Sequence, residues 1–336
     1  MSSKFWQDKR ILVTGATGFI GSWLTEELVR RNSMVTIFVR KEDPLGTDAV
    51  AHLLDKIKII YGDIKDIDSI KNAVINQDII FHLAAYSQVI NSLINPIEAM
   101  GVNATGTLNL LESIRKSKSD PIFIFSSTDK VYGEPKYLPI DEKHPLNAKS
   151  PYDASKLAAD RLTFSYHIAY DIKAIISRWS NVIGGRDANY LRALPDFIIT
   201  MLKNKPPAIR GNGKHIRDYM YVTDAINGVL LLAEKNSQVK GEAFNFGTER
   251  PTSVIDLANL VIKYMNFGNK LEPVILNKST PGEISGQYLT AKKAVNELKW
   301  KPHVDLESGI KLTIEWYRKN SWWLDVIERV KHYYDS

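Results

Sequence analysis

Short apolar runs alternate with helical patterns along the first half of the chain. The runs that predict strands are Arg10 to Thr14, Met34 to Val39, Ile57 to Tyr61, Asp78 to Leu83, Pro121 to Ser126 and Lys173 to Ser177. Helical spacing follows the first run, from Gly18 to Arg31, and returns near Pro151. Strands that are apolar throughout and alternate with helices are typical of a parallel sheet covered on both faces. The pattern therefore predicts an α/β fold of the Rossmann type, with a doubly wound parallel sheet.

The regular alternation ends after Asn181. Residues 184–195 and 203–219 are punctuated by Gly and Pro, which indicates loops and short elements. We expect these pieces to belong to a smaller, mixed α/β lobe that selects the substrate. The expected main domain covers 1–181 together with about 217–248, and the expected lobe covers about 182–216 and 249–336.

Composition narrows the possible functions. No segment is apolar for long enough to cross a membrane, and Met1 to Arg10 lacks the layout of a secretion signal, so we expect a cytoplasmic protein. The chain has no Cys, and its 7 His are scattered without ligand spacing, which argues against disulfides, a thiol nucleophile and a bound metal. The net charge of +6 is spread along the whole chain among Asp and Glu, which favours anionic small substrates over nucleic acid.

A glycine-rich turn stands between the first predicted strand and the first predicted helix. Glycines permit a tight turn and close backbone approach, while the helix N-terminus presents free N–H groups to a pyrophosphate. The turn therefore predicts a nicotinamide dinucleotide site. Its candidate residues are Gly15, Thr17, Gly18, Phe19, Ile20 and Gly21.

Later strand ends should complete this cofactor site. Where NAD-specific proteins place an acidic residue after the second strand, this chain has Arg40 and Lys41. Two cations suit a 2'-phosphate, which modestly favours NADP over NAD; the alternative is that both only pair with Glu42 and Asp43. The remaining cofactor candidates are Asp63, Ile64, Leu83, Ala84, Ala85, Asn103, Ser126, Tyr152 and Lys156.

Two segments carry candidate catalytic side chains. Tyr152 and Lys156 stand four residues apart at the start of a predicted helix, so the phenol and the ammonium share one face. The pKa of Tyr is ordinarily about 10 and must fall by about 3, equivalent to about 4 kcal/mol, before Tyr152 works as a base near neutral pH. Lys156 and an oxidised nicotinamide would both lower it. Thr128, Asp129 and Lys130 follow the fifth predicted strand, at the edge where parallel sheets bind ligands.

These motifs resemble the extended short-chain dehydrogenase/reductase family, in its NAD-dependent epimerase/dehydratase branch, over essentially the whole chain. Within that branch, Asp129 and Lys130 are most similar to the pair found in CDP-glucose 4,6-dehydratases. Residues 5–24, with Trp23, and the segment that begins at Ser180 also look like those enzymes. The resemblance implies an enzyme that acts on a nucleotide-linked sugar with a tightly bound NAD(P) cofactor.

The resemblance also implies a mechanism. Tyr152, assisted by Thr128, takes the proton of the sugar 4-hydroxyl while hydride leaves C4. Asp129, kept protonated, donates to the departing 6-hydroxyl, and a 4-keto-6-deoxy sugar results. Lys130 is either the base that removes the C5 proton or only a partner of Asp129 or of a phosphate, and both alternatives stay open.

Substrate contacts are the least determined part of the site. The resemblance assigns them to Ser87, Gln88, Thr128, Asn181 and Arg217, with the Arg217 fork suited to a diphosphate. Where many dehydratases have Arg-Pro-Gly, this chain has Thr280-Pro-Gly-Glu283, so CDP-glucose is only a first guess for the substrate.

Two other functions use the same residues. A 4-epimerase would use the same Tyr152 and Lys156, with Asp129 incidental. A non-catalytic cofactor-bound scaffold need not keep Thr128, Tyr152 and Lys156 together, so their presence argues against it. The resemblance further implies a homodimer, formed by a four-helix bundle of the helices predicted over about Pro96–Lys118 and Pro151–Tyr170.

Overall fold

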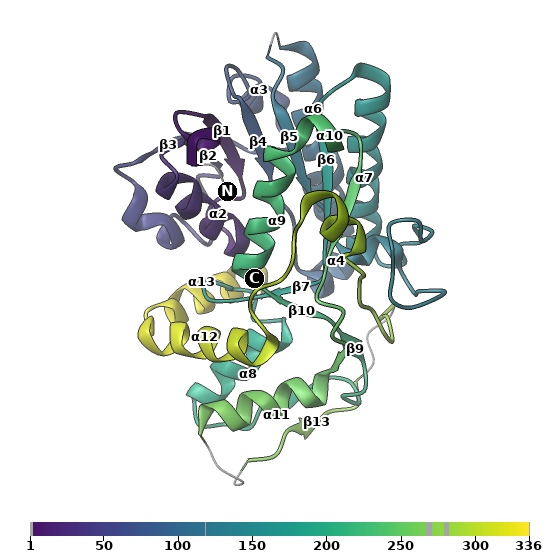
Figure 1. The fold of residues 1–336 in the computed structure, drawn as a ribbon. Helices are drawn as coiled ribbons and strands as arrows, with labels where there is room; N and C mark the ends of the chain where they lie inside the picture. Colours follow the sequence, from purple (N-terminus) through teal and green to yellow (C-terminus); the bar gives the residue numbers. More distant parts are fainter. Residues whose placement is uncertain (1–2, 118, 267–270, 279–281, 336) are drawn as a thin grey trace.

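A seven-stranded parallel sheet forms the centre of the molecule, in the order β11-β6-β5-β4-β1-β2-β3 (Figure 1). The computed structural model describes residues 3–117, 119–266, 271–278 and 282–335. The strands are β1 (Arg10–Thr14), β2 (Met34–Val39), β3 (Ile57–Tyr61), β4 (Ile79–His82), β5 (Ile122–Ser126), β6 (Ala174–Trp179) and β11 (Ala243–Phe246). The predicted Rossmann-type α/β fold is confirmed.

Side chains of successive strand residues enter different layers. Ile11 and Val13 of β1 join the larger apolar core, on the face covered by α2 (Phe19–Arg30) and α9 (Val222–Glu234). Leu12 joins a second core, under α6 (Gly106–Lys116) and α7 (Pro151–Tyr170). Because a strand alternates sides at every residue, this division explains why the strand sequences are apolar throughout.

The helix predicted from Pro96 is interrupted. It consists of α5 (Pro96–Met100), a π-helical turn (Gly101–Thr105) and α6, and Lys118 lies outside the described residues. A π turn inserts an extra residue and turns side chains toward new partners. Here the extra residue lets Asn103 point at the loop after β4, where its Oδ1 accepts from the N–H of Tyr86 at 2.8 Å.

A second group of elements lies beyond the carboxyl ends of the sheet (Figure 1). Its helices are α8 (Ala193–Leu202), α11 (Val254–Met265), α12 (Leu306–Lys319) and α13 (Trp323–Asp335). Its strand pairs are β7 (Asn181–Ile183) with β10 (Tyr219–Tyr221), β9 (Ile216–Arg217) with β12 (Thr252–Ser253), and β8 (Ala208–Ile209) with β13 (Val274–Ile275). The larger apolar core runs from β1 into this group, and the expected domain boundaries stay a prediction.

Short elements complete the chain. They are α1 (Ser3–Trp6), a 3-10 turn (Asp48–Leu53), α3 (Ile67–Ile70), α4 (Val89–Ile94), a 3-10 turn (Asp129–Tyr132), α10 (Asn236–Val239) and a π turn (Ala294–Leu298). Among the described residues, none of the helices combines the length and the apolar character that a bilayer span requires.

Candidate active site

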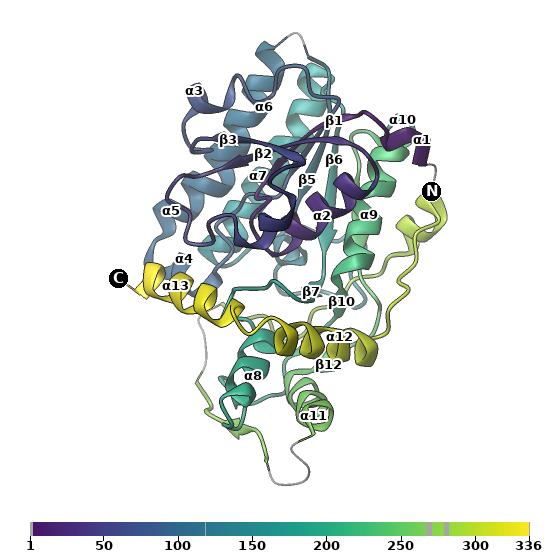
Figure 2. The same cartoon turned by 90° about the vertical axis from the view of Figure 1, so that its left-hand side faces the viewer.

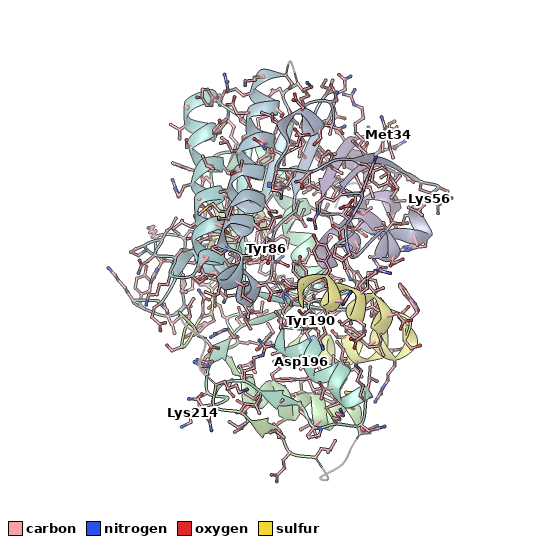
Figure 3. All side chains as sticks on the ribbon, turned by 180° about the vertical axis from the view of Figure 1, so that it is seen from behind. Met34, Lys56, Tyr86, Tyr190, Asp196 and Lys214 are labelled. Carbon is pink, nitrogen blue, oxygen red and sulfur yellow. The ribbon has the colours of Figure 1, made fainter. Side chains whose placement is uncertain are left out.

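A cavity of about 410 Å³ follows the carboxyl edge of the sheet, between the turn after β1 and the loop before α8. Figure 3 shows the molecule from behind, with Tyr86 above Tyr190 and Asp196. The predicted site residues that line the cavity are Gly15, Thr17, Gly18, Phe19, Ile20, Gly21, Arg40, Asp63, Ile64, Leu83, Ala84, Ala85, Ser87, Gln88, Ser126, Thr128, Asp129, Lys130, Tyr152, Lys156 and Asn181.

Three predicted site residues, all within the described ranges, do not line the cavity. Lys41 is exposed, so of the two neighbouring cations only Arg40 reaches the lining. Asn103 is buried behind the lining, where its Nδ2 donates to Ser155 Oγ at 2.8 Å. Arg217 turns one N–H back to the carbonyl of Ile216 at 2.8 Å. Thr280 and Pro281 lie outside the described residues.

The turn after β1 fits a dinucleotide. Gly15 has φ +71°, and a Cβ there would lie 2.6 Å from the N of Ala84. A Cβ on Gly21 would lie 2.0 Å from the carbonyl oxygen of Gly15, so both positions require glycine. Gly18 is the N-cap of α2 and offers no side-chain cap. The first N–H groups of α2 therefore lack a side-chain acceptor at the cavity wall, as a pyrophosphate site requires.

Arg40 stands at the end of β2 in a partly buried setting. Its Nη2 lies 3.4 Å from Oδ2 of Asp43. Burial lowers the pKa of Arg40, but the nearby acidic groups, with Asp43 first, outweigh burial and raise it. Arg40 therefore keeps its positive charge at the cavity.

A capping box fixes the start of α7 and so the place of Tyr152. Ser150 Oγ accepts from the N–H of Asp153, and Asp153 Oδ2 accepts from the N–H of Ser150. Four residues after Tyr152, Lys156 is buried, and its Nζ donates to the carbonyl of Ser126 at 2.5 Å. Helix α7 thus brings both candidate side chains to the end of β5.

Burial shifts the two groups in opposite directions. It lowers the pKa of Lys156 to about 7, with Asp160 opposing. It raises the pKa of Tyr152 to about 12, and the strongest opposing group is Arg192, not Lys156 as the sequence suggested. The hydroxyl of Thr128 also lowers the pKa of Tyr152. Burial outweighs both groups, so a base at Tyr152 needs positive charge beside it in addition to Arg192.

Asp129 and Lys130 form an ion pair, and both hydrogen-bond to Gln287, a residue distant in the sequence. The buried Asp129 accepts from Thr128 Oγ1 at 3.0 Å and from Lys130 Nζ at 3.4 Å. Gln287 donates to the backbone carbonyl of Asp129 at 2.6 Å, and its Oε1 accepts from Lys130 Nζ at 2.5 Å. Burial lowers the pKa of Lys130 against the pull of Asp129, and Arg217 lowers it further.

Several residues that complete the site were not predicted from the sequence. Arg192 lines the cavity, and its Nη1 donates to the buried Asp187 at 3.0 Å. Gln287 reaches Asp129 from 158 positions away, so no local spacing could have indicated it. Val330 and Tyr334 of α13 also line the cavity. For Asp187 and Arg192, the visible signal in the sequence was an Asp followed five residues later by an Arg.

The chain matches proteins that modify nucleotide sugars. The profile of the family described as GDP-mannose 4,6 dehydratase matches residues 12–313. A putative UDP-glucose 4-epimerase of Methanocaldococcus jannaschii is 37% identical over 93% of this chain and 99% of the relative. The human dTDP-D-glucose 4,6-dehydratase is 32% identical over 95% of each chain.

The similar solved structures also include both a 4-epimerase and a 4,6-dehydratase. The UDP-glucose 4-epimerase of Thermotoga maritima with UDP-glucose is 32% identical, with TM-score 0.85, over 93% of this chain and 99% of that one. The dTDP-glucose 4,6-dehydratase DesIV of Streptomyces venezuelae, with NAD bound, is 25% identical, with TM-score 0.86, over 94% and 99%. The predicted resemblance is confirmed, and the chain belongs to the GDP-mannose 4,6-dehydratase family of NAD-dependent epimerases and dehydratases, which have the extended short-chain dehydrogenase/reductase fold.

Proposed function

We propose that this chain is a nucleotide-sugar 4,6-dehydratase, which converts an NDP-hexose to an NDP-4-keto-6-deoxyhexose. The observation that carries this proposal is the buried Asp129, which lies on the cavity wall between Thr128 and Lys130. Loss of water from C6 needs an acid for the departing hydroxyl, whereas inversion at C4 needs none. The polar substrate and cofactor agree with the expected cytoplasmic location.

The cofactor site consists of the glycine turn and the later strand ends. The nicotinamide dinucleotide, when bound, supplies reversible hydride exchange with the sugar. We propose NADP, because Arg40 presents a charged guanidinium at the end of β2 and its contact with Asp43, at 3.4 Å, is long enough for a phosphate to displace. Mass spectrometry of the dinucleotide extracted from the purified protein tests this choice, since NAD in that extract would contradict it.

The first proton moves to Tyr152. Its phenolate takes the proton of the sugar 4-hydroxyl as the C4–H bond breaks, and a C4 ketone forms. Arg192 and the hydroxyl of Thr128 favour the phenolate by lowering the pKa of Tyr152. Lys156 Nζ donates to the carbonyl of Ser126 at the end of β5. Because burial lowers the pKa of Lys156 to about 7, its amine can be charged or neutral near neutral pH.

Water is lost in the second stage. The ketone acidifies the C5 proton, which Lys130 removes in its neutral form, while Asp129 protonates the departing C6 hydroxyl. Burial lowers the pKa of Lys130 and so favours that neutral form. Hydride addition at C6 and protonation at C5 then give the 4-keto-6-deoxy product.

CDP-glucose is the proposed substrate, on the basis of the Asp129-Lys130 pair. Purified protein is incubated separately with CDP-glucose, UDP-glucose, dTDP-glucose and GDP-mannose, and mass spectrometry follows the loss of one water. Loss from CDP-glucose alone supports both proposals. Loss of water from another nucleotide sugar would support the dehydratase but replace CDP-glucose as its proposed substrate.

A 4-epimerase is the second candidate, because the Methanocaldococcus jannaschii relative and the Thermotoga maritima structure both carry that name. It would use Tyr152 and Lys156 in the same way, with Asp129 as a structural partner of Lys130. Unchanged mass together with an inverted C4 configuration in the NMR spectrum would establish it. An intact Thr128, Tyr152 and Lys156 at one cavity argues against a scaffold without activity.

A further inference from the structure

The C-terminal helix α13 forms one wall of the cavity. The buried Val330 and the partly buried Tyr334 line it, beside Arg40, Asp43 and Leu45 from the end of β2 and the loop that follows. The residues matched by the family profile end at 313, ten residues before α13 begins. This wall therefore comes from a part of the chain that the profile does not describe.

Arg329 connects α13 to the segment that follows β2. Arg329 Nε donates to the carbonyl of Pro44 at 2.6 Å, and its Nη2 contacts the carboxylate of Asp48. Pro44 and Leu45 both line the cavity. The contact thus joins the helix to a loop that is itself part of the cavity wall.

Other contacts hold the two ends of the helix. At its start, Trp323 is fully buried, and five residues later Glu328 accepts from Lys203 of α8 at 2.9 Å. At its far end, the ring of Tyr334 meets the ring of Tyr86 edge to face, with centroids 5.7 Å apart. The helix therefore spans from α8 to the loop after β4, along the boundary between the sheet and the lower group (Figure 2).

The position of Tyr334 indicates what the helix covers. Tyr334 lies close enough to Arg40 and Asp43 for their charges to act on its phenol. In dinucleotide folds the end of the second strand holds the adenosine ribose, so the cofactor's adenosine half would lie beneath α13. If the adenosine half lies there, its release would require α13 to move away from the loop of Pro44.

We infer that α13 is part of the cofactor site and acts as a clasp over the adenosine half, so that the dinucleotide stays bound from one turnover to the next. The inference rests on the proposed function, because it presumes a dinucleotide at the glycine turn. It also agrees with the proposed chemistry. Hydride taken from C4 is returned at C6, so the cofactor is regenerated in place and turnover needs no exchange.

The test measures how fast bound dinucleotide exchanges with isotopically labelled dinucleotide in the full chain, by gel filtration and mass spectrometry. Arg329→Ala should speed exchange by about tenfold or more, since it removes charge-assisted hydrogen bonds. Lys331→Ala is the matched control, because it removes one exposed positive charge from the same helix and should leave the rate unchanged. Tyr334→Ala, which opens the wall without removing a charge, should also speed exchange.

Hydrogen exchange of α13 gives a second readout that needs no catalysis. Backbone amides of residues 323–335 should exchange more slowly when the dinucleotide is bound. Equal exchange rates of the dinucleotide in wild type, Arg329→Ala and Tyr334→Ala, with no added protection of α13, would overturn the clasp alone. A wild-type chain that binds no dinucleotide would instead overturn the proposed function.

Discussion

Arg192 is the side chain that most strongly opposes the effect of burial on Tyr152. Burial first, and then Asp153 and Asp129, raise the pKa of Tyr152, and Arg192 is the strongest of the groups that lower it. Asp187 orients Arg192 and is itself held by Asn189, whose N–H donates to Asp187 Oδ1 at 3.0 Å. The buried carboxylate of Asp187 therefore fixes the position of the partly exposed Arg192 guanidinium.

Replacing Arg192 by Met should move the pH profile. Loss of the cation raises the pKa of Tyr152, so the phenolate forms only at higher pH and the acidic limb of kcat/KM moves to higher pH. Arg161→Met, at an exposed position of α7, is the control and should leave the limb in place. A lower rate at every pH with an unmoved limb would show that Arg192 acts only on structure.

Replacing Asp129 by Asn should separate oxidation from dehydration. The amide cannot protonate the departing hydroxyl, so water loss should fall by about 10²- to 10⁴-fold while the 4-keto hexose still forms. In a single-turnover reaction, borodeuteride trapping followed by mass spectrometry detects that ketone. Tyr152→Phe is the control, since it should lose the ketone as well. Unimpaired water loss in Asp129→Asn would assign the acid to another group.

At the scale of elements, a buried ionic network ties α7 to β6 behind the site. Arg178 of β6 makes two hydrogen bonds to Asp160 of α7, at 2.8 and 2.9 Å, and both side chains are buried. Ser127, next to the catalytic segment, donates to the same carboxylate at 2.8 Å. The network fixes the end of β5 relative to the helix that carries Tyr152 and Lys156.

Asp160→Asn should destabilise the protein strongly. It leaves the Arg178 charge buried without a counterion, for which we expect a loss of about 3–5 kcal/mol in the free energy of unfolding. Urea denaturation monitored by circular dichroism measures it. Asp68→Asn breaks an exposed pair with Lys71 and should leave the free energy of unfolding almost unchanged. Equal effects of the two changes would contradict this account of the network.

The sequence predicted the strands of the sheet well, with one exception. Six apolar runs correspond to β1 to β6, because burial on both faces leaves a continuous apolar signal. The seventh strand, β11, includes Asn245, which interrupts its apolar run. That Asn is buried because Tyr132 donates to its Oδ1 at 2.7 Å, a tertiary contact that no local pattern reveals.

The candidate site also contains some residues that the sequence predicted and others that it could not predict. Its local motifs, the glycine turn and the segments around Thr128 and Tyr152, could be found because each lies on one element. Gln287 and Tyr334 could not be found, because distant parts of the chain bring them to the cavity. Spacing rules describe single elements, and these residues depend on how the elements pack.

At the scale of the whole molecule, stability should depend on keeping His82 neutral. Thr107 Oγ1 donates to the carbonyl of Asn103, so it accepts from Nε2 of His82 at 2.9 Å. Nδ1 of His82 then accepts from Thr14 Oγ1 at 2.8 Å, which leaves no place for a second proton. Burial first, and then Lys156, lower the pKa of His82 to about 3.

The free energy of unfolding should therefore fall as the pH falls from about 6.5 toward 3. In that range the unfolded chain binds a proton at this position and the folded chain does not, which destabilises the fold by on the order of 5 kcal/mol. Urea denaturation at a series of pH values, with wild type and His82→Gln, isolates this contribution. The variant should show a shallower fall, and identical slopes would contradict the assignment.

We further propose that the chain is a homodimer through α5, α6 and α7. Ile97 of α5 and Ile168 of α7 are 85% and 67% exposed, and they belong to two helices that pack against each other. Exposed apolar side chains that form one patch mark an interaction surface. Light scattering should give the mass of a dimer for wild type and of a monomer for Ile97→Glu. Ile75→Glu, at a half-exposed position outside these helices, should stay dimeric. A monomeric wild type would contradict the proposal.

One labelling experiment tests the central claim most directly. CDP-glucose carrying deuterium at C4, or the hexose that the substrate panel selects, is converted by the purified protein, and NMR and mass spectrometry locate the label. A dehydratase that takes hydride from C4 and returns it to C6 gives a product one water lighter with deuterium at C6. Deuterium back at C4, with no water lost and the configuration inverted, would contradict the dehydratase and establish the epimerase.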